Sequence, residues 1–109
     1  MSVRIDVGAV DQVLARNRTV MTIPESGTPS VLILRTRRGI FAVENSCPHA
    51  ERRLSDASAR GRRLTCSGHR GSFDLRSGRP TDATRSRLTR RPLRSFPAWV
   101  ADGRLYIEV

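Results

Sequence analysis

Two cysteines and two histidines are the residues of this 109-residue sequence best suited to binding a metal. They form two short motifs, Cys47-Pro48-His49 and Cys66-Ser67-Gly68-His69, separated by residues 50–65. These four residues are the entire thiol and imidazole content of the chain. Thiolates and imidazoles are ligands for zinc and for iron centres. Four such residues in two compact motifs predict a single metal centre held between two loops.

Two kinds of centre fit this ligand inventory. One is a tetrahedral zinc ion with two Cys and two His ligands. The other is a 2Fe–2S cluster with thiolates on one iron and imidazoles on the other. Zinc sites usually pair Cys with Cys and His with His, whereas each motif here mixes the two types. The mixing favours the iron–sulfur cluster, and zinc stays open as the rival.

Short strands must position these loops. Apolar runs of β-branched residues alternate with turn residues, and no window has a long helical period. The predicted strands cover residues 3–7, 19–23, 31–34, 40–43, 62–66, 73–75, 93–100 and 105–109. A continuous apolar run makes the segment 31–34 a buried strand, and Asp102-Gly103 predicts the turn of a closing hairpin. Residues 11–18 are the one weak candidate for a helix.

The pattern predicts an all-β fold of stacked antiparallel sheets or a barrel. We expect a single domain over residues 1–109, with the two metal-binding loops forming a small subdomain at about 45–75. The remaining irregular stretches, 45–63 and 79–92, are predicted to be loops. The five aromatic residues are expected to be mostly core, because a small barrel needs bulk to fill it.

The paired motif resembles that of the Rieske family, which has Cys-x-His, a spacer of about this length, and Cys-x-x-His. The surroundings are similar as well, in the segments 41–49, 54–56, 69–78 and 92–106. The resemblance implies a stacked β-sheet fold and one Rieske-type 2Fe–2S cluster. It implies that Cys47 and Cys66 bind the inner iron and that His49 and His69 bind the outer iron near the surface, where electrons enter and leave.

The resemblance also implies a function. The chain is expected to be a soluble one-electron carrier that passes electrons from a flavin-containing reductase to a terminal oxygenase. It is not expected to be an enzyme in its own right, because 109 residues leave no room for a catalytic iron domain. The small subunit of an assimilatory nitrite reductase is the alternative within the same chemistry, although those proteins often lack some cluster ligands, and all four are kept here.

Departures from the respiratory members of the family predict the reduction potential. Those proteins carry a second Cys pair that ties the loops by a disulfide, and a Ser and a Tyr that donate hydrogen bonds near the cluster. The matching positions here are Gly71 and Phe73, which have no hydroxyl group, and the chain has no other Cys. We expect a potential at the lower end of the Rieske range of about −150 to +300 mV. Arg70, after the second His, should raise it slightly.

The charge is strongly positive. Twenty basic residues, all Arg, against ten acidic ones give a net charge of +10. GC-rich coding accounts for part of this bias, and attraction of partners with acidic docking faces is the functional reading. A nucleic-acid-binding module is a further alternative, based on Arg60, Arg62, Arg63 and the Arg-rich segment 85–94. No helix-turn-helix or RNA-binding motif and no interleaved aromatic residues support that alternative.

The remaining expectations concern location and assembly. No apolar stretch reaches the roughly 18 residues of a membrane helix, and residues 1–6 lack the features of an export signal. We therefore expect a cytoplasmic monomer with no contact to a membrane.

Overall fold

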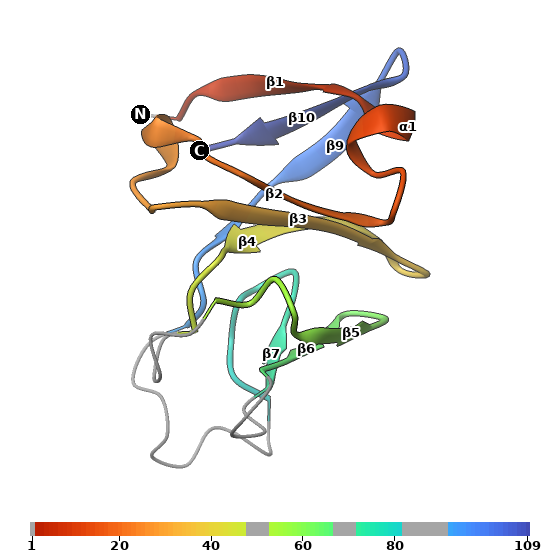
Figure 1. Ribbon diagram of the computed structural model, residues 1–109. Coiled ribbons are helices and arrows are strands. Elements are labelled where there is room, and N and C mark those ends of the chain that lie inside the picture. Colours follow the sequence, from red (N-terminus) through yellow and green to blue (C-terminus); the bar gives the residue numbers. More distant parts are fainter. Residues whose placement is uncertain (1, 48–52, 67–71, 82–91) are drawn as a thin grey trace.

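The computed structural model describes residues 2–47, 53–66, 72–81 and 92–109. Within these ranges the protein is almost entirely β-structure, as predicted (Figure 1). Its strands are β1 (Arg4–Ala9), β2 (Arg18–Met21), β3 (Val31–Thr36), β4 (Gly39–Glu44), β5 (Ser58–Arg60), β6 (Arg63–Thr65), β7 (Ser72–Asp74), β8 (Ser95–Phe96), β9 (Ala98–Ala101) and β10 (Arg104–Glu108). Two short helices accompany them, α1 (Val10–Val13) and the 3-10 turn η1 (Pro24–Ser26).

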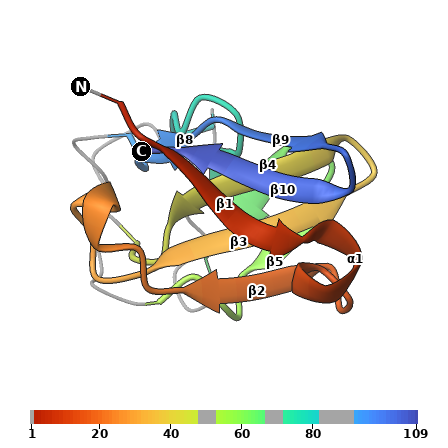
Figure 2. The same ribbon diagram turned by 90° about the horizontal axis from the view of Figure 1, so that it is seen from above.

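The strands form three antiparallel sheets. Their orders are β1-β10-β9, β2-β3-β4-β8 and β5-β6-β7. Viewed from above, the first sheet crosses over the second (Figure 2). The third sheet lies beneath the second (Figure 1). The middle sheet therefore has a neighbour on each face. The segment that leads to Cys47 comes from the second sheet, and the segment that leads to Cys66 comes from the third.

The apolar run in β3 is explained by this position. Val31 and Ile33 pack into the core shared with the first sheet, while Leu32 and Leu34 pack into the core shared with the third. All four side chains are at most 1% exposed. Successive residues of a strand point to opposite faces, so a strand buried on both faces has no polar positions. The predicted buried strand is confirmed.

Several predicted boundaries were wrong. The segment 45–63, predicted to be a loop, contains β5, which pairs with β6. The single strand predicted over 93–100 is two strands, because Pro97 has no N–H to continue a ladder, and β8 pairs with β4 while β9 pairs with β10. The helix expected over 11–18 is one turn long and begins at Val10.

The closing hairpin is as predicted. Asp102 and Gly103 both have positive φ, 52° and 75°, and join β9 to β10.

Of the aromatic residues, Phe41, Phe73 and Phe96 are buried. Trp99 and Tyr106 are half-buried and stack on each other with ring centroids 5.9 Å apart. In the described ranges, none of the helices is long and apolar enough to cross a membrane.

Candidate metal centre

The two cysteines lie directly beyond the ends of two strands. Cys47 follows β4 after two residues, and Cys66 immediately follows β6. Both thiol-bearing residues are 2% exposed and belong to the same apolar core, between the middle sheet and the third sheet. The fold therefore brings into one core the two cysteines that the sequence predicts as ligands, although they lie 19 residues apart in the sequence.

The two histidines cannot be placed in the same way. His49 and His69 lie outside the described residues, as do Arg70 and Gly71. In the ranges that the structure does describe, no group of three or more His, Cys, Asp or Glu side chains gathers as a metal site. The thiol half of the predicted ligand set is thus brought together, and the imidazole half stays a prediction.

The donor chemistry fits an iron–sulfur cluster. A pair of buried thiols in an apolar core supplies the soft anionic ligands that sulfide-bridged iron prefers. Phe73, which the resemblance described above matches to the Tyr of the respiratory proteins, is fully buried in this same core. Its side chain offers no hydrogen bond there, as the sequence predicts.

Asn45 fastens the first loop at both of its ends. Its side-chain Oδ1 accepts a hydrogen bond of 2.8 Å from the backbone N–H of Leu54. Its Nδ2 donates to Ser30 Oγ at 3.2 Å, and its own N–H donates to the Ser30 carbonyl at 3.0 Å. The residue is 7% exposed. Asn45 therefore closes the segment 46–53, which contains Cys47 and His49, and anchors it to the middle sheet.

Arg18, from β2, binds the residues that follow this segment. Its Nη1 donates to the carbonyls of Ser55 and Ala57, at 2.7 Å in each case. A cation from β2 thus supports the loop that leads into β5.

Glu44, at the end of β4, is 4% exposed and is bound to Arg94 by two hydrogen bonds. Its carboxylate accepts from the backbone N–H of Arg94, and its own backbone N–H donates to the Arg94 carbonyl, both at 2.9 Å.

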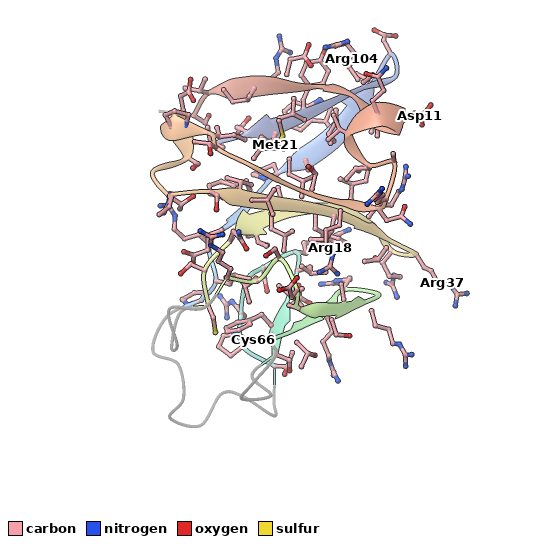
Figure 3. The ribbon with its side chains drawn as sticks, viewed as in Figure 1. Asp11, Arg18, Met21, Arg37, Cys66 and Arg104 are labelled. Atoms are coloured by element: carbon pink, nitrogen blue, oxygen red, sulfur yellow. The ribbon has the colours of Figure 1, made fainter. Side chains whose placement is uncertain are left out.

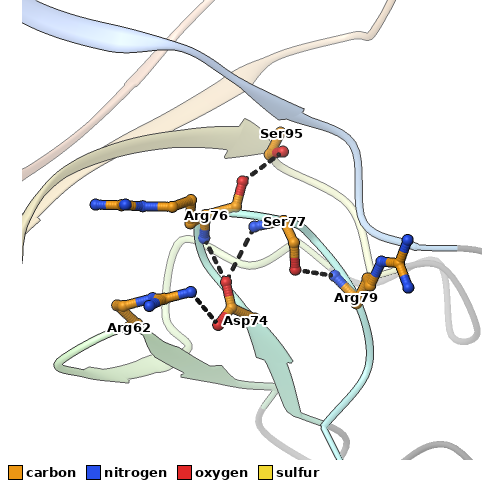
Figure 4. A network of polar contacts seen from close by, with 6 residues as sticks. All are labelled: Arg62, Asp74, Arg76, Ser77, Arg79 and Ser95. Carbon is orange, nitrogen blue, oxygen red and sulfur yellow. Dashed lines mark hydrogen bonds and ion pairs between the residues drawn. The ribbon is translucent and has the colours of Figure 1, made fainter.

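The turn after β7 is built around the carboxylate of Asp74 (Figure 4). Its Oδ1 accepts from the backbone N–H groups of Arg76 and Ser77, at 2.8 and 3.0 Å, and its Oδ2 accepts from Arg62 at 3.0 Å. Partial burial raises the pKa of this carboxyl, but the Ser77 and Arg76 N–H groups and the Arg62 guanidinium outweigh burial and hold the pKa of Asp74 below its ordinary value. The ionised carboxylate therefore organises the turn that follows the second loop.

These supporting residues were not found from the sequence. Asn45 carries a weak signal, because Asn side chains often bond to the backbone of nearby loops. Arg18 and Glu44 carry none, since their partners are 37 to 50 residues away in the chain.

Replacing Asn45 by alanine is expected to destabilise the protein by about 2 kcal/mol, because the Leu54 N–H is left buried without its acceptor. Chemical denaturation would measure this change, and faster loss of iron to a chelator would show that the loop has loosened. Ser30→Ala is the control, since it removes only the acceptor of the Asn45 Nδ2. Equal effects of the two substitutions would mean that the bond to Leu54 is unimportant.

Comparison with known proteins finds similarity to iron–sulfur proteins. The sequence profile of the Rieske [2Fe-2S] domain matches residues 3–97. The ferredoxin component of the p-cumate 2,3-dioxygenase system of Pseudomonas putida is 37% identical over 70 residues, 63% of this chain. That alignment covers 56% of the relative, so the chain spans little more than half the length of this curated protein.

Two solved structures share the fold. A chain of the complex of reduced oxygenase and oxidised ferredoxin in carbazole 1,9a-dioxygenase superposes with a TM-score of 0.72 and 25% identity, covering 95% of this chain and 91% of that one. The structure described as a putative NADH-dependent nitrite reductase small subunit from Mycobacterium tuberculosis superposes with a TM-score of 0.76, covering 100% and 96%. Its identity is 22%, which shows a common fold alone.

Proposed function

Because this chain belongs to the Rieske [2Fe-2S] domain family, we propose that it is a one-electron carrier of a multicomponent oxygenase system and not an enzyme in its own right. The cofactor of the family is one Rieske-type 2Fe–2S cluster, which decides against structural zinc. The observation that carries the proposal is the family match over residues 3–97 together with two buried thiols in one core.

The proposed ligands are Cys47 and Cys66 on one iron and His49 and His69 on the other. When bound, the cluster supplies a centre that accepts and releases one electron at a time. The chain's own residues bury the two thiols, fasten the first loop through Asn45 and Arg18, and shape the turn after β7 through Asp74. Because Phe73 supplies no hydroxyl, the proposed potential stays at the lower end of the Rieske range.

The proposed partners are a flavin-containing reductase and a terminal oxygenase. Support comes from the relatives, which are described as ferredoxin components of dioxygenase systems. We place the protein in the cytoplasm, where its two thiols stay reduced until a cluster is inserted, and we expect one domain over residues 1–109 that acts as a monomer.

Absorption and EPR spectra of anaerobically purified protein test the proposal. A red-brown protein with two iron and two sulfide per chain, and an EPR signal of an imidazole-ligated cluster after dithionite reduction, is the expected result. Colourless protein with equimolar zinc would end the electron-carrier account. His69→Cys tests the ligand set, because a thiolate in place of a neutral imidazole should lower the potential; an unchanged potential in cluster-loaded protein would contradict it.

The positive charge predicts a salt response. If the oxygenase and reductase present acidic docking faces, the second-order rate of electron transfer should fall steeply as ionic strength rises, because salt screens charges beyond about 10 Å at 0.1 M. Stopped-flow mixing of the reduced carrier with oxygenase at several salt concentrations measures this. A rate that does not change with salt would remove the acidic faces from the proposal.

A further inference from the structure

Arginines from three separate segments meet on one side of the molecule. They line a pocket of about 670 Å³ between the middle sheet and the third sheet, formed by Arg16, Arg18, Arg35, Arg37 and Arg60 with the backbone around them. A second pocket of about 290 Å³ shares Arg60 and adds Arg38, Arg62 and Arg63. We refer to these two neighbouring pockets, which share Arg60, as the arginine groove.

Two turns lying against each other form the floor of the groove. The Thr36 hydroxyl, beside the β3–β4 turn, donates to the carbonyl of Gly61 in the β5–β6 turn at 2.5 Å. The stem of Arg38 passes over the same glycine, where a Cβ would lie 3.5 Å from its Cγ. The groove is therefore a fixed feature of the junction between the two sheets.

Two of the five arginines in the first pocket, Arg18 and Arg35, are oriented by hydrogen bonds to uncharged acceptors. Arg18 donates to the carbonyls of Ser55 and Ala57. Arg35 donates to Asn17 Oδ1 at 3.1 Å and to the Leu14 carbonyl at 3.0 Å. All of these acceptors are uncharged, so the guanidinium groups are held in place while their charge stays available.

Acidic groups offset little of this charge. Among the described residues, no carboxylate lines the first pocket, and Asp74 in the second is paired with Arg62. Arg16, Arg37 and Arg60 are exposed, and the described part of the chain gives them no ion pair. A groove with this lining attracts an anion with several charges.

The first pocket of the groove, lined by Arg16, Arg37 and Arg60, lies away from the two thiol-bearing residues. β4 runs from the β3–β4 turn toward Cys47 over six residues, and β6 runs from the β5–β6 turn toward Cys66 over three. At about 3.3 Å per residue these strands place the two turns that border the first pocket roughly 20 and 10 Å along the strands from the two cysteines. Figure 3 shows Arg37 at the far tip of the β3–β4 turn and Arg18 between the sheets, with Cys66 displaced toward the other side.

We propose that the arginine groove binds an acidic segment of a partner protein, at a site separate from the surface through which electrons pass. Carboxylates suit it because a guanidinium donates two parallel hydrogen bonds to one carboxylate. Nucleotides and nucleic acids suit it less, because no aromatic side chain among the described lining residues offers a stacking surface for a base.

Binding of a fluorescein-labelled hexaglutamate peptide to the cluster-loaded protein tests this. At low ionic strength the wild type should bind the peptide, and the variant Arg16→Gln/Arg37→Gln/Arg60→Gln should bind it about tenfold more weakly, since three ion pairs are lost. These three arginines are exposed and form no ion pair within the described residues, whereas the side chains of Arg18 and Arg35 donate hydrogen bonds to other segments and are left intact. The visible spectrum checks that the cluster is retained.

The matched control is Arg4→Gln/Arg76→Gln/Arg79→Gln, which removes the same charge from exposed positions outside the groove. It should weaken binding less than about twofold. Equal losses in the two variants, or no peptide binding by the wild type, would overturn the proposal. So would tighter binding of tripolyphosphate or an oligothymidylate than of the peptide through the same three arginines. The proposed binding site is additional to the proposed electron-carrier function. The peptide assay measures binding alone, so its result does not depend on whether the protein transfers electrons.

Discussion

Replacing Cys66 by serine is expected to strip the protein of its iron, with at least a tenfold fall in iron and sulfide bound per chain. The side chain is 2% exposed and lies in the core that also holds Cys47. A serine hydroxyl is a much poorer ligand for iron than a thiolate at neutral pH. The visible absorption should fall with the iron content, and because metal binding is coupled to folding, the third sheet should also lose stability.

The measurement needs a control for damage to the core. Val43→Ala removes two methyl groups from a fully buried position of the same core and leaves both thiols intact. It should destabilise the protein by about 1–3 kcal/mol while iron stays bound. Cys66→Ser protein that keeps full iron, or Val43→Ala protein that loses it to the same degree, would show that Cys66 is not a ligand.

The sequence predicted the layers of the fold where pattern and burial coincide. The run Val31–Leu34 indicated a buried strand because both of its faces are covered, and Asp102-Gly103 indicated a tight turn because both residues tolerate positive φ. β5 was missed because Ser58–Arg60 has no apolar alternation of its own. Only its pairing with β6 makes it a strand.

In the candidate site, too, local features could be predicted and long-range contacts could not. Cys47 and Cys66 were predicted because each belongs to a short motif that can be recognised in the sequence. The support from Arg18 depends on carbonyls 37 and 39 residues away, so nothing near Arg18 in the sequence indicates it. The arginine groove shows the same limit: Arg60, Arg62 and Arg63 were grouped by sequence with residues 85–94, whereas the topology joins them to Arg16, Arg18 and the β3–β4 turn. Residues 85–91 lie outside the described ranges.

Gly78→Ala is the substitution of a glycine from which we expect the largest loss of stability. Gly78 has φ of 76°, donates its N–H to the Asp74 carbonyl and accepts from the Leu93 N–H, each at 2.7 Å. A Cβ at this position would overlap the carbonyl oxygen of Leu93 and lie 2.9 Å from its carbonyl carbon. The backbone of Leu93 would have to move, and that residue is 1% exposed in the core of the two cysteines.

The displacement should extend to the metal-binding loops, because the segment after Leu93 is tied to Glu44 through Arg94. We expect a loss of about 3 kcal/mol or more, and therefore a fall in Tm of roughly 10–20 °C for a domain of this size. Gly103→Ala is the matched control, since its φ of 75° is nearly the same but no atom lies within 4 Å of the added Cβ. It should cost only about 1 kcal/mol, the conformational penalty itself. Thermal unfolding separates the two contributions: equal losses would mean that positive φ, and not the close approach of Leu93, decides the stability of this turn.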